Sequence, residues 1–301
     1  MCMDLPIDHL RTLAVVVNQG SLEAAAKHLH ITPSAVSQRI RGLEERVGSV
    51  LLRRTRPVSV TEAGAAVLRA ARQVEQVVSD LASELEQGST GGSLIPVVVN
   101  ADSLATWFVP ALARAASETG ARFEVIRADE TISTEKLQSG EAMAALTATR
   151  EAVPGCTSSP IGVDRYYAVA TPEFVVEYFA SGLSAATLAA APQLEFDRHD
   201  MFQQRFIKRI TRARVDPPCH FVPSSAEFVM AIELGMGWGM VPRLQCAESL
   251  ASGQLVEIMP GSHIDLPLYW QRWNLRSPVL DALSEVIADE ARLALTLGTP
   301  K

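Results

Sequence analysis

The sequence predicts an α/β protein whose N-terminal part is rich in α-helix, and three observations support this. Three segments with helical spacing of apolar residues lie within the first 48 residues. A Gly/Ser-rich stretch at residues 87–93 is typical of a flexible linker. Beyond it, short apolar runs alternate with helical segments, which is the pattern of an α/β domain with a parallel sheet.

The first 48 residues contain start and stop signals for three helices. Residues 7–19 form the first predicted helix, which Gly20 ends. Ser21 can cap a second short helix, and a tight turn follows it. Thr32-Pro33 is a strong start signal for a third helix, which Gly48 ends. Two short helices, a turn and a third helix make a helix-turn-helix unit.

The exposed face of the third predicted helix carries side chains suited to reading DNA. Hydroxyl and amide groups lie near its start and basic groups further along, and such groups contact base edges and phosphates. The alternative is a solvated face on a core helix. Together with the caps before it, this face gives the candidate DNA-binding residues Ser21, Thr32, Ser34, Ser37, Gln38, Arg39 and Arg41.

A basic segment follows the third helix and predicts a wing. Leu51-Leu52 is a short apolar strand, and Arg53, Arg54 and Arg56 come next, beside Pro57. Three arginines beside a proline turn suit contact with phosphates or the minor groove. Residues 1–72 hold ten basic and six acidic residues, which gives this part a net charge of +4. Since the whole chain has a net charge of −7, the remaining residues have a net charge of −11. A basic head on an acidic body is expected when only the head touches phosphates.

Thr61-Glu62 opens a long predicted helix with apolar residues alternating by four and three, as in a coiled coil. An exposed seam of this length implies a partner helix, with burial against the chain's own body as the alternative. The candidate dimerisation residues are Val67, Ala71, Val74, Val78, Leu81 and Leu85. The head therefore spans residues 1–59, the linker helix 60–87 and the body 92–301.

Several segments of the head resemble the LysR-type transcriptional regulators. They are residues 21–44 (SLEAAAKHLHITPSAVSQRIRGLE), Val47-Gly48, Leu51-Leu52-x-Arg54 and Thr61-Glu-Ala-Gly64. The family usually has Leu-Phe at Leu51-Leu52, which is a conservative departure. Residues 100–108 (NADSLATWF), 223–228 (PSSAEF) and 269–273 (YWQRW) resemble the LysG/ArgP branch.

The resemblance implies how the body is built and what the protein does. It implies two α/β subdomains joined by crossing strands, similar to a periplasmic binding protein, with residues 92–163 and 266–301 in subdomain I and 164–265 in subdomain II. It also implies an activator of a lysine/arginine exporter gene that senses basic amino acids. A regulator with another effector, such as an aromatic or aliphatic acid, is the alternative.

The strands and helices of the body place polar residues where ligands bind in such sheets. Predicted strands cover residues 94–99, 123–128, 143–148, 166–171, 194–197, 220–222, 238–241 and 268–273, with helices at 104–116, 134–140 and 278–297. Asp102-Ser103, Thr147 and Ser224-Ser225 follow strands or open helices, where helix N–H groups are available. A serine at a helix start can also be only a cap.

A basic amino acid presents a carboxylate and two cations. Hydroxyl and helix N–H groups suit the carboxylate, and side-chain carboxylates suit the cations. Each acid taken alone can also be a surface charge. The candidate effector-binding residues are Asp102, Ser103, Asp129, Glu130, Thr147, Asp197, Ser224, Ser225 and Glu227.

The sequence contains no signature of catalysis, metal binding or membrane insertion. The motifs G-x-S-x-G, H-E-x-x-H and G-x-x-x-x-G-K-[ST] are missing, and the four cysteines form no C-x-x-C pair. No catalytic residue, metal or cofactor is expected. The absence of a signal peptide argues against a plain solute-binding protein and favours a cytoplasmic location. Expected partners are double-stranded promoter DNA, a basic amino acid, further copies of the chain and RNA polymerase.

Overall fold

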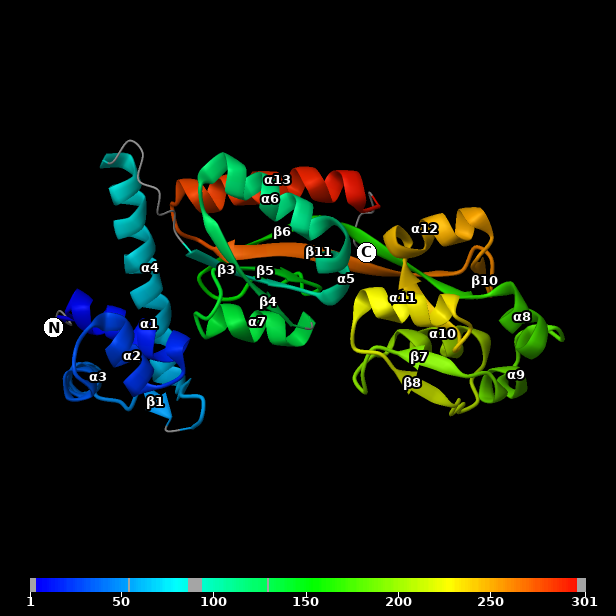
Figure 1. Ribbon diagram of the computed structural model, residues 1–301, viewed down its shortest axis with the longest axis horizontal. Helices are drawn as coiled ribbons and strands as arrows, with labels where there is room; N and C mark the ends of the chain where they lie inside the picture. Colours follow the sequence, from blue (N-terminus) through cyan, green and yellow to red (C-terminus); the bar gives the residue numbers. More distant parts are fainter. Residues whose placement is uncertain (1–3, 54, 86–93, 129, 297–301) are drawn as a thin grey trace. The chain divides into compact units, whose positions relative to one another are not determined.

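The computed structural model describes residues 4–53, 55–85, 94–128 and 130–296 (Figure 1). Two of the candidate residues, Arg54 and Asp129, lie outside the described residues. The chain packs into two compact units. Unit 1 contains residues 1–99, 112–159 and 270–286, and unit 2 contains residues 100–111, 160–269 and 287–301.

The head of unit 1 consists of three helices and a small hairpin, as the sequence predicts. The helices are α1 (Ile7–Gln19), α2 (Leu22–Leu29) and α3 (Pro33–Val47), and strands β1 (Leu52–Arg53) and β2 (Ser59–Val60) pair antiparallel. The Oγ of Ser21 accepts from the N–H of Ala24 at 3.1 Å, and Thr32 Oγ1 accepts from Ala35 at 3.2 Å. These contacts satisfy N–H groups that the first turn of a helix leaves unpaired.

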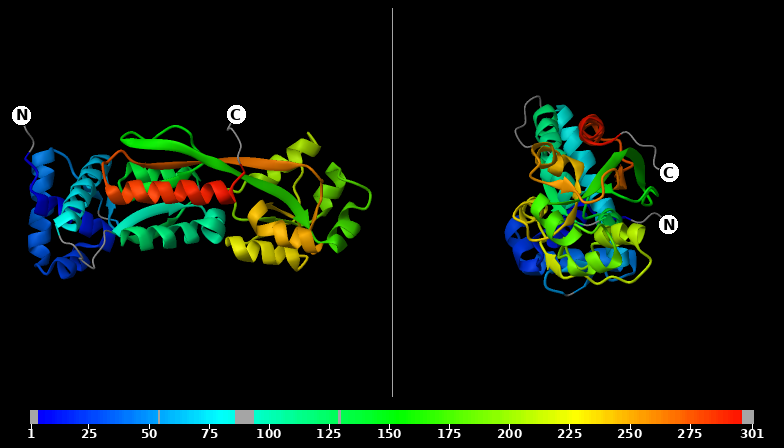
Figure 2. Two further views of the ribbon diagram at one scale, coloured as in Figure 1. Left: turned by 90° about the horizontal axis from the view of Figure 1, so that it is seen from above. Right: turned by 90° about the vertical axis from the view of Figure 1, so that its right-hand side faces the viewer.

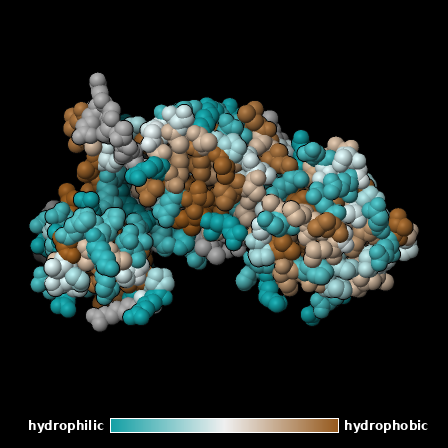
Figure 3. Space-filling model, in the orientation of Figure 1, coloured by the Kyte–Doolittle hydropathy of each residue, from teal (hydrophilic) through white to brown (hydrophobic). Residues whose placement is uncertain are grey.

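The long helix α4 (Glu62–Leu85) is buried in the head at its start and exposed toward its end. This corrects the expectation of one continuous dimer seam. Val67 and Ala71 are buried in the core of the head, together with Leu68 and the apolar faces of α1 and α3. They are therefore unavailable to a partner helix. Val78, Leu81 and Leu85 are exposed, and hydrophobic residues line this part of α4 in Figure 3.

The rest of unit 1 is built on parallel strands. Strand β3 (Leu94–Val99) pairs in parallel with β4 (Arg122–Arg127) and β5 (Ala144–Thr147), as the alternating pattern predicts. Helix α7 (Glu130–Gln138) connects β4 to β5, and its Leu137 is fully buried in a core with Val98. Helices α6 (Val109–Thr119) and α13 (Pro278–Ala294) each have residues in both units.

Unit 2 is formed mainly by residues 160–269. Its helices are α8 (Pro172–Phe179), α9 (Ala185–Ala190), α10 (Phe202–Ile210), α11 (Ser225–Glu233) and α12 (Arg243–Ser252). Strands β7 (Gln193–Glu195) and β8 (Cys219–Phe221) pair in parallel, whereas β9 (Gly239–Pro242) and β10 (Val256–Glu257) pair antiparallel with β6. The α5 (Ala101–Ser103) turn and the π-helix η1 (Leu104–Phe108) also belong to it.

Two long strands, β6 (Cys156–Ala170) and β11 (His263–Trp273), are neighbours in the main sheet, whose order is β10-β6-β11-β5-β3-β4. Figures 1 and 2 show them side by side. The sequence predicts only the last part of β6, because Pro160, Gly162 and Asp164 interrupt its apolar pattern. Within the described residues, no helix is both long and apolar enough to cross a membrane.

Candidate DNA interface and effector site

The recognition face of α3 presents an amide and a guanidinium to solvent. Gln38 and Arg41 are exposed, and Ser34 lies beside the cap, with its Oγ 2.9 Å from Thr32 Oγ1. Ser37 donates to the carbonyl of Pro33 at 3.0 Å. Buried Val36, one of the apolar residues on the opposite face, anchors the helix in the head core. An amide can read an adenine edge, and a guanidinium can read guanine or hold a phosphate.

Arg39 has a different environment from the other candidates on α3. Its Nη1 donates to Thr12 Oγ1 of α1 at 3.2 Å, and its Nη2 lies 3.9 Å from the carboxylate of Asp8. The side chain therefore lies against α1, where it connects two helices of the head. These contacts hold α3 against α1.

The hairpin that carries the basic segment is held by hydroxyl contacts. Thr55 Oγ1 donates to the carbonyl of Pro57 at 2.7 Å and lies 3.0 Å from Ser59 Oγ. Arg53 and Arg56 are exposed on this hairpin. An exposed guanidinium on a short turn is suited to contact with phosphates.

A hydrogen-bonded network in unit 2 is centred on the carboxyl group of Asp102. Asp102 Oδ1 accepts from Ser225 Oγ at 2.5 Å, and Oδ2 accepts from the hydroxyl of Tyr166 at 2.6 Å. Ser225 Oγ in turn accepts from Gln245 Nε2 at 2.7 Å. The ring of Phe202 stacks on Tyr166 with centroids 4.2 Å apart. Two candidates from distant segments, Asp102 and Ser225, are thus in direct contact.

Two further carboxyl groups lie in the electrostatic field of Asp102. Burial raises the pKa of Asp164 to about 7, and the charge of Asp102 adds to this effect. Burial also raises the pKa of Asp102 and of Asp200, although hydroxyl groups favour the charged form of Asp102 and backbone N–H groups that of Asp200. Buried carboxylates that repel one another are stabilised by a cation placed among them.

Two hollows occur in unit 2, and one of them adjoins this network. It measures about 480 Å³, and Gln245 lines it together with Thr106 and Trp107. The other, of about 450 Å³, includes Arg209 and Asp265 in its lining. Asp265 already accepts from the Arg165 guanidinium at 2.8 Å, so that hollow offers less to a cationic ligand.

The structure places the remaining candidates in several separate environments. Ser224 donates to the carboxylate of Glu227, so these two candidates pair with each other. Asp197 Oδ1 accepts from the N–H groups of His199 and Asp200, so it orders a turn. The Oγ of Ser103 is buried and has no hydrogen-bond partner among the described residues.

Thr147 and Glu130 belong to unit 1. Thr147 is fully buried, and its Oγ1 accepts from Gln271 Nε2 at 3.2 Å. Gln271 also donates to the carbonyls of Thr149 and Glu151, so it fixes the segment that follows β5. Glu130 is the first residue of α7.

Sequence reasoning missed Tyr166, Gln245, Asp164 and Asp200. One signal was present: Asp164 and Tyr166 are two residues apart on a strand, so they share a face. No sequence signal connected Gln245 to Ser225, because that contact depends on how α11 and α12 pack. Within the described parts of the chain, no three His, Cys, Asp or Glu side chains are grouped as a metal site.

These features define a class of protein: a winged helix-turn-helix that reads DNA, joined through a long helix to a ligand-binding α/β domain. Comparison with family models agrees with this class. Residues 7–65 match the bacterial regulatory helix-turn-helix protein, lysR family, and residues 96–292 match the LysR substrate binding domain. The chain belongs to the LysR family of transcriptional regulators.

Its relatives narrow this assignment within the family. The chain is 40% identical over 279 residues to the HTH-type transcriptional regulator LysG of Mycobacterium tuberculosis, covering 92% of this chain and 91% of that one. It resembles the crystal structure of ArgP from Mycobacterium tuberculosis with a TM-score of 0.87 at 39% identity, over 97% of this chain and 98% of that one.

A second solved structure is full-length LysG from Corynebacterium glutamicum with bound effector Arg. The TM-score is 0.80 at 35% identity, over 97% of this chain and 99% of that one. The protein is thus a LysR-type transcriptional regulator related to LysG and ArgP.

Proposed function

We propose that the protein activates transcription of a basic amino acid exporter gene in response to arginine, lysine or histidine. The observation that carries the effector assignment is the Asp102 network. A carboxylate offers about four acceptor positions, and the described contacts of Asp102 use two of them. The remaining positions suit an ammonium or guanidinium group, and that cation would also relieve the repulsion between Asp102 and Asp164.

The relative with bound effector Arg supports the same ligand class. The proposal keeps five further candidates: Ser103, Ser225, Asp129, Glu130 and Thr147. It leaves out Asp197, Ser224 and Glu227, which make local contacts. The DNA-binding role is assigned to the face with Ser34, Ser37, Gln38 and Arg41 and to the wing arginines. The exposed apolar residues Val78, Leu81 and Leu85 are proposed to bind a second copy of α4.

The effector proposal is tested by isothermal titration calorimetry on the full chain. Arginine, lysine and histidine are titrated, with citrulline as a neutral analogue of arginine. We expect binding of arginine and at least about a fivefold lower affinity for citrulline, since a hydrogen bond to a charged partner exceeds a neutral one by about 1 kcal/mol or more. Equal affinity for arginine and citrulline would contradict recognition of the distal cation.

A matched pair of variants locates the site. Asp102→Asn removes the central charge and should weaken arginine binding at least tenfold. Glu227→Gln removes an exposed acid that is paired with Ser224 and should leave the affinity unchanged. If Glu227→Gln weakens binding and Asp102→Asn does not, the effector lies at the start of α11 and our assignment is wrong. Binding of an aromatic or aliphatic acid in place of arginine would favour the alternative effector class.

A further inference from the structure

Arg72 of α4 is a buried arginine that nothing in the DNA or effector assignments uses. Only 7% of its surface is exposed. Its Nη1 donates to the carbonyl oxygen of Gly140 at 2.6 Å, and its Nη2 donates to Oδ1 of Asn18 at the end of α1. One guanidinium therefore joins the DNA-binding head to the turn that follows α7, and all of these residues lie in unit 1.

Gly140 allows α4 to approach this turn closely. A Cβ atom at Gly140 would lie 2.8 Å from the Cα of Arg69, and the φ of Gly140 is +75°. Any other residue would push α4 away and strain the backbone. Arg69 of α4 also contacts the body of the protein, since its Nη1 donates to the carbonyl of Pro154 at 3.3 Å.

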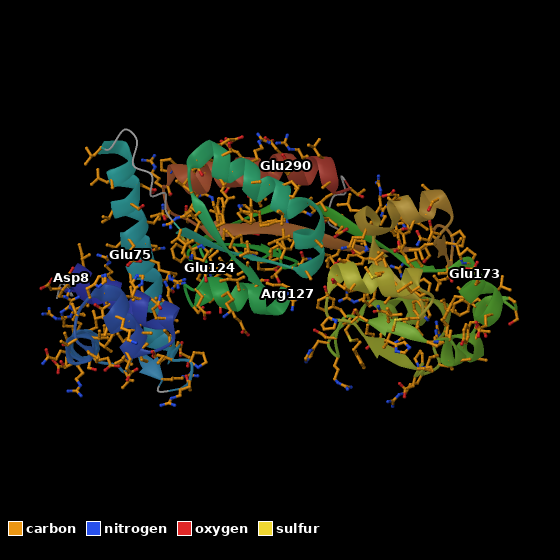
Figure 4. All side chains as sticks on the ribbon, viewed as in Figure 1. Asp8, Glu75, Glu124, Arg127, Glu173 and Glu290 are labelled. Atoms are coloured by element: carbon orange, nitrogen blue, oxygen red, sulfur yellow. The ribbon has the colours of Figure 1, made fainter. Side chains whose placement is uncertain are left out.

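The charges around Arg72 favour its cationic form. Burial lowers the pKa of Arg72, but the carboxylates of Glu124, Glu141 and Glu75 oppose this shift. Glu75 comes from α4 and Glu124 from β4 (Figure 4), so the charge of Arg72 is balanced from more than one element. Burial raises the pKa of Glu75, and the positive charges of Arg11 on α1 and of Arg72 oppose this shift. A buried arginine with planar, divergent donors is well suited to join two elements at fixed geometry.

The turn that contacts Arg72 is rigidly attached to α7. Ser139 and Gly140 donate their N–H groups to Glu135 and Leu137, and the N–H of Ala142 donates to Lys136. Helix α7 begins at Glu130, a proposed effector residue, and ends directly before this turn. A displacement at the start of α7 would therefore move the carbonyl that holds Arg72.

We propose that Arg72 is a clasp that fixes the DNA-binding head to the 139–142 turn, so that movement of α7 is transmitted to α1. The fixing of the head stands on the contacts of Arg72 alone. The transmission of an effector signal rests on the function proposed above. The clasp is broken from the head side by Asn18→Ala, at an exposed residue, and from the body side by Gly140→Ala.

Gly120→Ala is the matched control for Gly140→Ala. Gly120 has a similar φ of +68°, but nothing lies within 4 Å of the position of its Cβ. The control therefore introduces the same backbone strain without displacing α4. Thermal unfolding of each variant shows whether it is folded at the temperature of the measurement.

The experiment measures the distance between spin labels on the head and on unit 1 by pulsed electron paramagnetic resonance. Labels are attached to Glu45→Cys and Ser117→Cys, both exposed positions, in a full chain whose other accessible cysteines are serine. Labelled protein is mixed with an excess of unlabelled protein, so that each measured distance joins two labels on the same chain. We expect one narrow distance distribution for the labelled protein without further substitution (the parent) and for Gly120→Ala. Asn18→Ala and Gly140→Ala should shift the ratio of docked to undocked heads by about tenfold or more.

Distributions for Asn18→Ala and Gly140→Ala that match the parent would overturn the clasp. Arginine is then added as the probe. It should shift the distribution of the parent but not that of Gly140→Ala, and an equal shift in both would refute transmission through Arg72. If calorimetry shows that the parent does not bind arginine, the proposed effector is wrong, and the clasp is judged on the distributions without ligand.

Discussion

Replacing Asp164 by asparagine should make the protein more stable at neutral and alkaline pH. Asp164 is 4% exposed, and burial together with the charge of Asp102 raises its pKa from 3.8 to about 7. Asparagine has nearly the same shape, and its carbonyl can still accept the backbone N–H of Arg165. The substitution therefore removes the buried charge and keeps the packing.

The sign and size of the effect follow from this pKa. A group with a raised pKa in the folded state contributes stability that is fully present below its unfolded pKa and is lost as the pH rises through its folded pKa. The shift of about three pKa units corresponds to at most about 4 kcal/mol at about 1.4 kcal/mol per unit. We expect the free energy of unfolding of Asp164→Asn to exceed that of the unsubstituted protein by about 2–4 kcal/mol at pH 8. Near pH 4 the two values should be nearly equal.

The assay is urea unfolding of the full chain between about pH 4 and pH 8, followed by circular dichroism. Asp265→Asn is the control, because the hydrogen bond from Arg165 lowers the pKa of Asp265. Its stabilising contribution is present above the unfolded pKa and is lost only as the pH falls through the lower folded pKa. Asp265→Asn should therefore be destabilised by a similar amount from pH 5 to pH 8. A stability difference for Asp164→Asn that does not grow with pH would refute the assignment of a buried, repelled carboxylate.

Three other perturbations probe the remaining assignments. Gln38→Ala should weaken operator binding by about 1–3 kcal/mol relative to unrelated DNA in fluorescence anisotropy, whereas an equal loss on both DNAs would argue against base reading. Leu81→Lys should shift analytical ultracentrifugation profiles toward smaller species, and an unchanged profile would place the interface between copies elsewhere. Gly64→Ala should lower the stability by about 1–3 kcal/mol, since its Cβ would lie 2.0 Å from the carbonyl oxygen of Leu51. A higher melting temperature, as expected for alanine in an unobstructed helix, would contradict that contact.

Local signals were sufficient for the head. Ser21 and Thr32 each accept a backbone N–H three residues ahead, and Gly20 and Gly48 end α1 and α3 with positive φ. These interactions join residues that are close in sequence, so they are encoded wherever the segment occurs. The strands β3 and β5 were also predictable, because buried parallel strands form short apolar runs.

The spacing of apolar residues could not show which part of α4 is buried in the head and which part is exposed. Val67 and Leu81 belong to the same apolar spacing, yet Val67 is buried in the head and Leu81 is exposed. The spacing shows that a face is apolar and does not show which surface covers it. Arg39 shows the same limit, because an arginine on the outer face of a helix can reach either DNA or the neighbouring helix.

The sequence by itself determined the family, the order of elements and the candidate types of residue, since all of these depend on motifs and periodicity within short segments. Only the tertiary structure decided which candidates meet. It brought Asp102 to Ser225, 123 residues apart, and Arg72 to both Asn18 and Gly140. Such contacts depend on how whole helices and strands pack, and the residues involved carry no mark of their partners. Burial then gave them their chemistry, because it raises the pKa of a carboxyl group and makes a buried guanidinium depend on its hydrogen bonds.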